Sequence, residues 1–371
     1  MGNEPDVLPL WKAANYIMTF VAMTRDRVTI KKQVSGLIPR TLLVGALAAG
    51  SMLLTAPAEA SDYAPDSHPQ VAAMIDQLAQ NQGLDADALT ATMEHAQRSQ
   101  KVLDAMSHPA EHHLRWDQYR RIFLTPQRVN QGVEFIREHL DDFTRAEREY
   151  GVPREVIAAI LGVETTYGRN KGSIRVIDAL STLAFDYPPR HEFFRKQLEA
   201  YLTLTQQQHL DPLAMQGSYA GAFGYAQFIP TSYQAYAVDF NHNGKRDLNG
   251  EASDAIGSIA NYFSRHGWIK GLAVTLPMKG PATPPDDLPV NSVDSPAVNR
   301  QQLEQNGFTP LVPLNSNDRL TPIALDYADG HYDWWLGTQN FYVITRYNHS
   351  HLYAMAVTEL AEEIKEALNN Q

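Results

Sequence analysis

The stretch that decides the fold is Gly162-Val-Glu-Thr-Thr-Tyr-Gly-Arg-Asn170, which places one glutamate at the end of an apolar run. Within residues 153–164 the apolar side chains recur at helical spacing, on the same stripe as Glu164. Pro153 suits a first helical turn because its φ is fixed and it lacks an N–H. Gly168 is typical of a helix stop. The pattern predicts a buried helix that ends by presenting Glu164.

Two effects are expected to raise the pKa of the Glu164 carboxyl. Burial against apolar neighbours disfavours the charged form, and so does the negative end of the helix dipole. A carboxylic acid that stays protonated near neutral pH can protonate the leaving oxygen of a glycoside. Periodicity alone also allows a helix-end glutamate half exposed to water, because perturbed carboxyls also serve structure.

Composition bounds the class of protein. The 371 residues are 44% hydrophobic and 20% charged, which is ordinary for a globular chain of two or three packed units. The absence of cysteine excludes disulfides, thiolate zinc sites, a cysteine nucleophile and a lipid anchor on cysteine. The net charge of −11 argues against sequence-independent nucleic-acid binding and against docking on anionic lipid.

The first 60 residues have the pattern of a secretory signal. A basic region at 25–40 precedes an apolar run at 41–55, and Ala58-Glu-Ala60 then forms a cleavage pattern before Ser61. The alternative is a membrane span, but the apolar run is short of the roughly 20 residues that a bilayer requires. Acidic residues ahead of the basic region are unusual in a signal, so Met23 is an alternative start.

The rest of the chain divides into segments that differ in composition and hydrophobic pattern. Residues 61–150 read as helices, with a break at 81–83 and one long amphipathic helix over 126–150. Residues 151–270 continue as helices joined by glycine-rich segments. Prolines are dense in 277–296, and short alternating runs at 311–314 and 321–329 indicate a small β-rich insertion over 271–336. Residues 337–371 return to helices and are expected to pack back on the helical body.

The segment 216–232 combines glycines with aromatic side chains. Its glycines allow the backbone to turn sharply or to approach a ligand, and its aromatic faces suit packing on sugar rings. Gln227 offers both a donor and an acceptor. The alternative interpretation is a helix of small residues packed tightly in a core.

Residues 239–247 match the first half of an EF-hand loop, D-x-[DN]-x-[DN]-G, with Lys245 at the position that gives a backbone carbonyl. The match fails at the twelfth position, which is Gly250 where a bidentate glutamate is expected. Glu251 or Asp254 could close a longer loop. The segment predicts a weak, structural Ca²⁺ site over 239–254, and the alternative is an Asn/Gly-rich turn without metal.

Four ordered motifs together resemble the family 3 lytic transglycosylases. They cover residues 162–168, 218–230, 254–263 and 340–350, and the likeness extends over nearly all of the chain after residue 60. The resemblance implies a mainly α (α+β) fold. Its parts are a helical N-terminal domain (61–150), a lysozyme-like helical core (151–270), a small β-rich domain (271–336) and a C-terminal segment (337–371) that rejoins the core.

The resemblance also implies an activity and a set of residues. The activity is cleavage of the β-1,4 bond between N-acetylmuramic acid and N-acetylglucosamine in peptidoglycan, leaving 1,6-anhydromuramic ends without consuming water. Glu164 matches the single catalytic acid/base, and Ser218 and Gln227 match residues that hold the sugar near the scissile bond. The further implied contacts to saccharide or peptide are Tyr119, Arg190, Tyr262, Tyr347 and Tyr353, and the implied calcium ligands are Asp239, Asn241, Asn243, Lys245 through its carbonyl, and Asp254.

The chain departs from the family in two ways. Asparagine replaces aspartate in the calcium loop, and the lipobox cysteine of the membrane-anchored members is missing, so a soluble periplasmic form is expected. The expected partners are peptidoglycan glycan strands, with cell-wall synthesis proteins as further candidates. The competing functions are a hydrolytic muramidase that uses the same acid and a non-catalytic peptidoglycan-binding scaffold.

Overall fold

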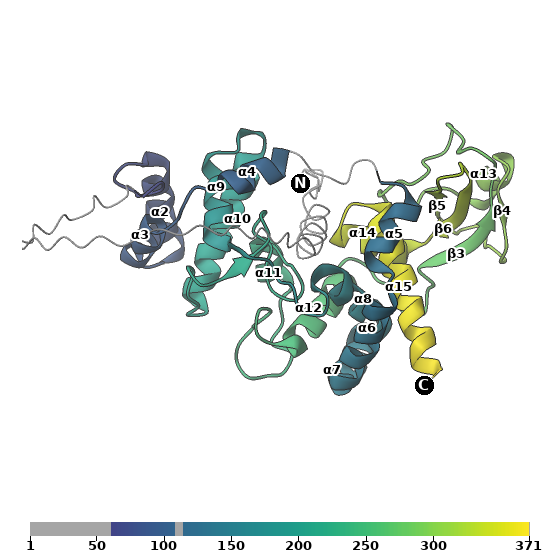
Figure 1. Ribbon diagram of the computed structural model, residues 1–371, viewed down its shortest axis with the longest axis horizontal. Helices are drawn as coiled ribbons and strands as arrows, with labels where there is room; N and C mark the ends of the chain where they lie inside the picture. Colours follow the sequence, from purple (N-terminus) through teal and green to yellow (C-terminus); the bar gives the residue numbers. More distant parts are fainter. Residues whose placement is uncertain (1–60, 108–113, 371) are drawn as a thin grey trace, which may run out of the picture.

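The computed structural model describes residues 61–107 and 114–370, and the signal region predicted over 1–60 lies outside them. Figure 1 shows a row of helices with a small sheet at one end. Among the described residues, no helix has the length and apolar character needed to span a bilayer. The architecture is mainly helical, and the predicted fold class, a lysozyme-like helical core with a small β-rich part, is confirmed.

The first helices lie at the end of the molecule opposite the sheet (Figure 1). Helix α2 (Pro69–Gln82) stops at Gly83, whose φ of 67° is the left-handed conformation that favours glycine, so the break expected at 81–83 is confirmed. Helices α3 (Ala86–Glu94) and α4 (Gln100–Ser107) follow. They pack on α2 and on α9 respectively. One continuous apolar cluster therefore joins these helices to the rest of the helical body.

The single helix predicted over 126–150 is wrong. The chain forms α6 (Pro126–Glu138) and α7 (Leu140–Tyr150), which meet at His139 with φ −119° and ψ 31°. Acidic side chains at Asp141 and Asp142 lie in the first turn of α7, where they favour a new helix start. Amphipathic spacing continues across the break, which explains why periodicity missed it.

Helix α8 (Arg154–Thr165) is the centre of the helical body. Its residues 156–165 are all buried, and it packs against α6, α7, α12 and α15. Pro153, expected in the first helical turn, instead precedes the helix as its N-cap with a non-helical ψ of 138°. The helix ends before Gly168, because Thr166 already has a left-handed φ of 50°. The remaining helices around it are α5 (Trp116–Phe123), α9 (Val176–Phe185), η1 (Pro188–Arg190), α10 (His191–Gln207), α11 (Pro230–Tyr236), α12 (Ala252–Arg265), α14 (Gln339–Tyr347) and α15 (His351–Asn369).

The β-rich part is a four-stranded antiparallel sheet in the order β4-β3-β6-β5, beside the short helix α13 (Arg300–Gln305). The strands are β3 (Thr275–Lys279), β4 (Thr309–Pro310), β5 (Thr321–Asp326) and β6 (Tyr332–Gly337), and a separate pair joins β1 (Ile174–Arg175) to β2 (Gln216–Gly217). This sheet and its loops have an apolar cluster of their own. The strand expected at 311–314 is absent from the described structure, and Pro313 there cannot donate to a ladder.

Asn340 fastens the sheet to the helical body. Its fully buried side chain accepts from the Ile269 N–H at 2.8 Å and donates to the carbonyls of Ile269 and Leu272. These contacts tie the start of α14 to the segment that leads into β3. The domain boundaries given above stay predictions.

Candidate active site and calcium loop

The end of α8 presents Glu164 to the start of α15. The side chain of Glu164 is 9% exposed, and its Oε1 accepts a hydrogen bond of 2.8 Å from the Tyr353 hydroxyl. Tyr353 is fixed by the helix start, since the Ser350 hydroxyl caps α15 by accepting the Tyr353 N–H at 3.2 Å. The carboxyl on the predicted apolar stripe is therefore buried, which excludes the alternative of a half-exposed helix end.

An aromatic wall lies next to this carboxyl. Tyr347 on α14 donates its hydroxyl to the Ala226 carbonyl at 2.5 Å, and Tyr262 on α12 donates to the Arg346 carbonyl at 2.6 Å. The two rings meet edge to face at 5.0 Å. Burial, with the neighbouring Glu164 charge, raises the pKa of Tyr347 well above its ordinary value. Helices that are far apart in the sequence thus converge on Glu164.

After strand β2, residues 218–229 form tight turns, so the alternative of a small-residue helix is wrong. The Ser218 hydroxyl oxygen accepts the N–H groups of Ala220 and Ala222 at 3.3 and 3.0 Å. At Gly224, with φ 74°, a Cβ would lie 2.4 Å from the Leu248 carbonyl oxygen, so only glycine fits.

Gln227 is locked within the same turns. It has a left-handed φ of 47°, and its side-chain amide donates to the Lys171 and Gly224 carbonyls at 3.1 and 3.0 Å. The loop is also tied to the end of α8, because the Thr165 hydroxyl donates to the Tyr225 carbonyl at 3.0 Å. Thr165 received no role in the sequence analysis, although it directly follows the glutamate of the motif.

The other predicted contact residues lie on different elements. Tyr119 is buried on α5, with its ring centroid 5.2 Å from that of Phe123. Arg190 lies in η1, where its guanidinium carbon is 4.4 Å from the centroid of the Phe193 ring, and burial lowers its pKa. Their contacts with substrate stay predictions, as do those of Ser218, Gln227, Tyr262, Tyr347 and Tyr353.

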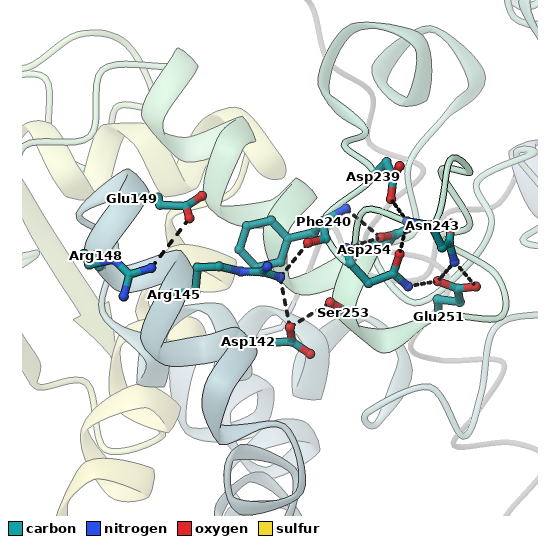
Figure 2. Close-up of polar contacts among 11 residues, drawn as sticks. Asp142, Arg145, Arg148, Glu149, Asp239, Phe240, Asn243, Glu251, Ser253 and Asp254 are labelled. Carbon is teal, nitrogen blue, oxygen red and sulfur yellow. Dashed lines mark hydrogen bonds and ion pairs between the residues drawn. The ribbon is translucent and has the colours of Figure 1, made fainter.

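Figure 2 shows the predicted calcium loop. The Asp239 carboxylate accepts the N–H groups of Asn243 and Gly244 at 3.0 and 2.8 Å, which shapes the turn. Glu251 faces the asparagines, and its carboxylate accepts from the Asn243 amide at 2.9 and 3.0 Å and from the Asn241 amide.

Asp254 occupies the inner side of the loop. It is completely buried, and its two oxygens accept the N–H groups of Phe240 and Asp247 at 2.8 Å each. Burial raises its pKa. Among the described residues there is no group of three or more His, Cys, Asp or Glu side chains arranged for a metal.

The chemistry of the donors still suits calcium. Carboxylate, amide and backbone carbonyl oxygens are the ligands that Ca²⁺ prefers. The loop supplies Asp239, Asn241, Asn243 and the Lys245 carbonyl, and Glu251 is the carboxylate opposite the asparagines. Asp254 is completely buried whereas Glu251 is partly exposed, so Glu251 is the more accessible carboxylate, and the role of Asp254 as a ligand stays a prediction.

Arg145 on α7 attaches the loop to the helical body. The guanidinium carbon lies 3.8 Å from the centroid of the Phe240 ring, and the guanidinium also pairs with Asp142 at 3.1 Å (Figure 2). Asp142 in turn accepts from the Ser253 hydroxyl at 2.8 Å. Both ends of the loop are therefore attached to the helical body by side chains of α7.

Comparison with known proteins gives a consistent result. Residues 66–362 match the Transglycosylase SLT domain. The membrane-bound lytic murein transglycosylase B of Escherichia coli K12 is 40% identical over 307 residues, which is 80% of this chain and 83% of that protein.

Solved structures agree with the sequence match. The soluble lytic transglycosylase SltB1 of Pseudomonas aeruginosa is 43% identical with a TM-score of 0.76, over 81% of this chain and all of that one. The lytic transglycosylase Slt35 of Escherichia coli, solved in complex with calcium, is 41% identical with a TM-score of 0.77, over 84% of this chain and 96% of that one. With a buried glutamate at the end of its central helix, the chain belongs to the SLT-type lytic murein transglycosylases, lyase-type enzymes that cleave peptidoglycan.

Proposed function

We propose that Glu164 is the single acid/base of this transglycosylase. The proposal is supported by its place on a buried helix and by its hydrogen bond from Tyr353. A buried carboxyl that keeps its proton near neutral pH can protonate the glycosidic oxygen between muramic acid and glucosamine. The bond from C1 of muramic acid to that oxygen then breaks, and positive charge develops at C1.

The second half of the reaction returns the proton. The Glu164 carboxylate takes the proton of the muramic O6 hydroxyl, while O6 forms a bond to C1 and closes the 1,6-anhydro ring. The proton given to the leaving oxygen is thus replaced, and no water is consumed. The substrate's own N-acetyl group can stabilise the charge at C1, as in glycosidases that use substrate assistance.

The observation that carries this proposal is the state of the other buried carboxyls. Among the described residues the buried acids are Glu164, Asp178 and Asp254. Asp178 is held by Arg175 at 2.7 Å, and Asp254 accepts backbone N–H groups. Glycosidases that use two carboxyls place both beside the bond. Asp178 and Asp254 are therefore not candidates for a second catalytic carboxyl, which supports the assignment of Glu164.

Mass spectrometry of products released from purified peptidoglycan tests the proposal, with wild type compared with Glu164→Gln. Muropeptides lighter by one water than reducing-end products, formed only by the wild type, are the expected result. Glu164→Gln is expected to keep saccharide binding. Full activity in that variant would overturn the role of Glu164, and reducing-end products from the wild type would indicate a hydrolytic muramidase. Binding to the wall without cleavage by the wild type would indicate a scaffold.

The substrate-contacting residues form a second part of the proposal. We assign Ser218 and Gln227 to the sugar near the scissile bond, since both lie in the loop that is tied to the end of α8 through Thr165. Aromatic rings suit packing on sugars, and the further assigned contacts are Tyr119, Arg190, Tyr262, Tyr347 and Tyr353. Arg190 is the residue of this set that is not buried, so Arg190→Ala is expected to raise KM for glycan strands, and an unchanged KM would remove Arg190 from the assignment.

We further propose that the loop 239–254 binds Ca²⁺ in a structural role. The support is the oxygen donor set of this chain and the related Slt35, which was solved in complex with calcium. Bound calcium would supply positive charge that holds the loop's oxygens together. The chain's own residues would be Asp239, Asn241, Asn243 and the Lys245 carbonyl, with Glu251 or Asp254 completing the site.

We place the enzyme in the periplasm, as a soluble protein acting on glycan strands and without a lipid anchor. The support is the signal pattern of residues 1–60 and the absence of cysteine. Fusion of residues 1–60 to a reporter that is active only after export tests this location. A reporter that stays inactive would overturn it. Cell-wall synthesis proteins stay candidate partners.

A further inference from the structure

The turn that follows Glu164 has an unusual backbone. Thr166, Tyr167 and Gly168 are left-handed in succession, with φ values of 50°, 58° and 81°. Only glycine adopts this conformation without a steric cost, and a β-branched residue such as threonine rarely does. Such backbone persists where the surrounding structure imposes it. Contacts with the surrounding structure must therefore hold the turn.

The Tyr167 side chain packs between two neighbouring helices, α6 and α8. Its ring lies between Gly162 on α8 and Gly132 on α6. A Cβ at Gly162 would lie 2.7 Å from the Tyr167 Cζ, and a Cβ at Gly132 would lie 2.5 Å from the Tyr167 hydroxyl oxygen. The ring is 6% exposed. Two helices thus approach closely enough to clamp the ring only because each carries glycine at the contact.

Helix α6 also holds the turn through polar contacts. The Tyr167 hydroxyl donates to the Arg128 carbonyl at 3.0 Å, and the Arg128 guanidinium lies 3.4 Å from the Thr166 hydroxyl. Arg128 and Gly132 are four residues apart, so they lie on one face of α6. One face of α6 therefore contacts both residues that follow Thr165.

The far end of the turn is equally confined. The Gly168 N–H donates to the Thr165 hydroxyl at 2.9 Å, and a Cβ at Gly168 would lie 1.9 Å from the Tyr225 ring. The same Thr165 hydroxyl donates to the Tyr225 carbonyl. The turn is thereby held between α6 and the loop that contains Gln227.

We propose that Tyr167 is a positioning residue for the reaction: its ring, clamped between Gly132 and Gly162, holds the left-handed turn and so fixes Glu164 against Tyr353. This proposal rests on Glu164 being the acid. The carboxyl leaves the last turn of α8, two positions before the turn begins, so a change in the path of the turn moves the carboxyl as well. Displacements of about 1 Å in an active site can lower turnover about 100-fold.

Kinetics and stability of Tyr167→Leu, Gly162→Ala and their combination test this role. Tyr167→Leu is expected to lower kcat at least ~10-fold with KM within about twofold, because the reaction geometry and not the saccharide contact is lost. The pH profile of kcat/KM is expected to move as the carboxyl leaves the Tyr353 hydroxyl. Gly162→Ala is expected to lower kcat in the wild type and far less in the Tyr167→Leu background, because the clash is with the ring.

Tyr201→Leu is the matched control, because it makes the same change at another buried tyrosine. Tyr201 is a buried tyrosine on α10 whose hydroxyl donates to the Pro212 carbonyl at 2.8 Å, the same kind of contact that Tyr167 makes. Tyr201→Leu is expected to lower the melting temperature and to leave the pH profile of kcat/KM unchanged. If Tyr167→Leu behaves in the same way, with lower stability but wild-type kcat and pH profile, the positioning role is wrong.

Two variants distinguish the possible outcomes of this test. If Tyr167→Leu does not fold, Gly162→Ala in the wild-type background decides, because its Cβ displaces the ring: a lower kcat with a shifted pH profile supports the proposal, and a profile like that of Tyr201→Leu overturns it. Glu164→Gln is measured in parallel. Turnover in Glu164→Gln would overturn the proposed role of Glu164 as the acid. An inactive Glu164→Gln beside fully active Tyr167 variants would overturn only the positioning role of Tyr167.

Discussion

The Tyr353 hydroxyl donates a 2.8 Å hydrogen bond to Glu164 across 189 positions of sequence. It joins the first turn of α15 to the last turn of α8, two helices that pack along each other. A donor to a carboxylate stabilises the charged form and restricts its rotation. Tyr353 therefore affects both the direction in which the acid points and the pH at which it loses its proton.

Tyr353→Phe removes this hydrogen bond while keeping the ring. A hydrogen bond to a charged group contributes about 1.5–3 kcal/mol, so turnover is expected to fall about 10- to 100-fold if most of it is realised in the transition state. Loss of the donor raises the pKa of Glu164, so the high-pH limb of kcat/KM moves to higher pH. Tyr201→Phe is the control, and an unchanged limb in Tyr353→Phe would contradict a direct effect on the acid.

Thr166→Asn is expected to stabilise the protein. A left-handed conformation costs a β-branched residue about 1–2 kcal/mol, and asparagine adopts it more readily. The melting temperature is expected to rise by roughly 2 °C for a chain of this size. Thr166→Ala is the matched control, because it loses the same hydroxyl but keeps the backbone strain. Equal melting temperatures in the two variants would show that the backbone of Thr166 stores no strain.

Local pattern was enough to find the parts of the site. The stripe that ends at Glu164 predicted a buried carboxyl, and the glycines of 216–232 predicted turns or close approach, as Gly224 now confirms. These features depend on neighbours within a few residues. The mainly helical fold followed from the same kind of signal, helped by four motifs in a fixed order.

The features that local sequence pattern did not predict depend on contacts between residues far apart in the sequence. The break at His139 preserves amphipathic spacing and so leaves no trace in the periodicity. Helix α8 ends at Thr165, before a left-handed turn whose Tyr167 side chain contacts α6, and no local rule for helix stops contains such a contact. The choice between Glu251 and Asp254 depends on which of the two carboxylates the folded loop leaves accessible.

Calcium is expected to raise the melting temperature of the wild type, and Glu251→Gln is expected to remove most of that rise. For a Kd of about 10⁻⁴–10⁻³ M, calcium at about 10 mM stabilises by roughly 1.4–2.7 kcal/mol. The measurement is thermal unfolding in calcium against a chelator. Glu149→Gln on α7 is the control, since its carboxylate pairs with Arg148 at 3.8 Å and lies on the helix beside the loop (Figure 2). An equal calcium effect in Glu251→Gln would leave Asp254 as the carboxylate that completes the site.

His351 is expected to make the fold sensitive to mild acid. It begins α15, where burial lowers its pKa to about 4 although the Asp326 carboxylate opposes that change. The folded pKa lies below the ordinary value of about 6.5, so the unfolded chain binds the proton more readily. The contribution of neutral His351 is therefore complete above about pH 6.5 and declines as pH falls toward 4. A pKa difference of one corresponds to about 1.4 kcal/mol.

Chemical unfolding of wild type and His351→Asn between pH 4 and pH 7 measures this contribution. The free energy of unfolding of the wild type is expected to fall more steeply on acidification, so that the two proteins differ most at pH 7 and converge toward pH 4. His209→Asn, at an exposed histidine in the turn that follows α10, is the control for loss of a histidine at the surface. Parallel curves for wild type and His351→Asn would show that His351 takes up its proton without opposing the fold. Because the same first turn of α15 carries Tyr353, the loss of stability is expected to bring a loss of the Glu164 hydrogen bond with it.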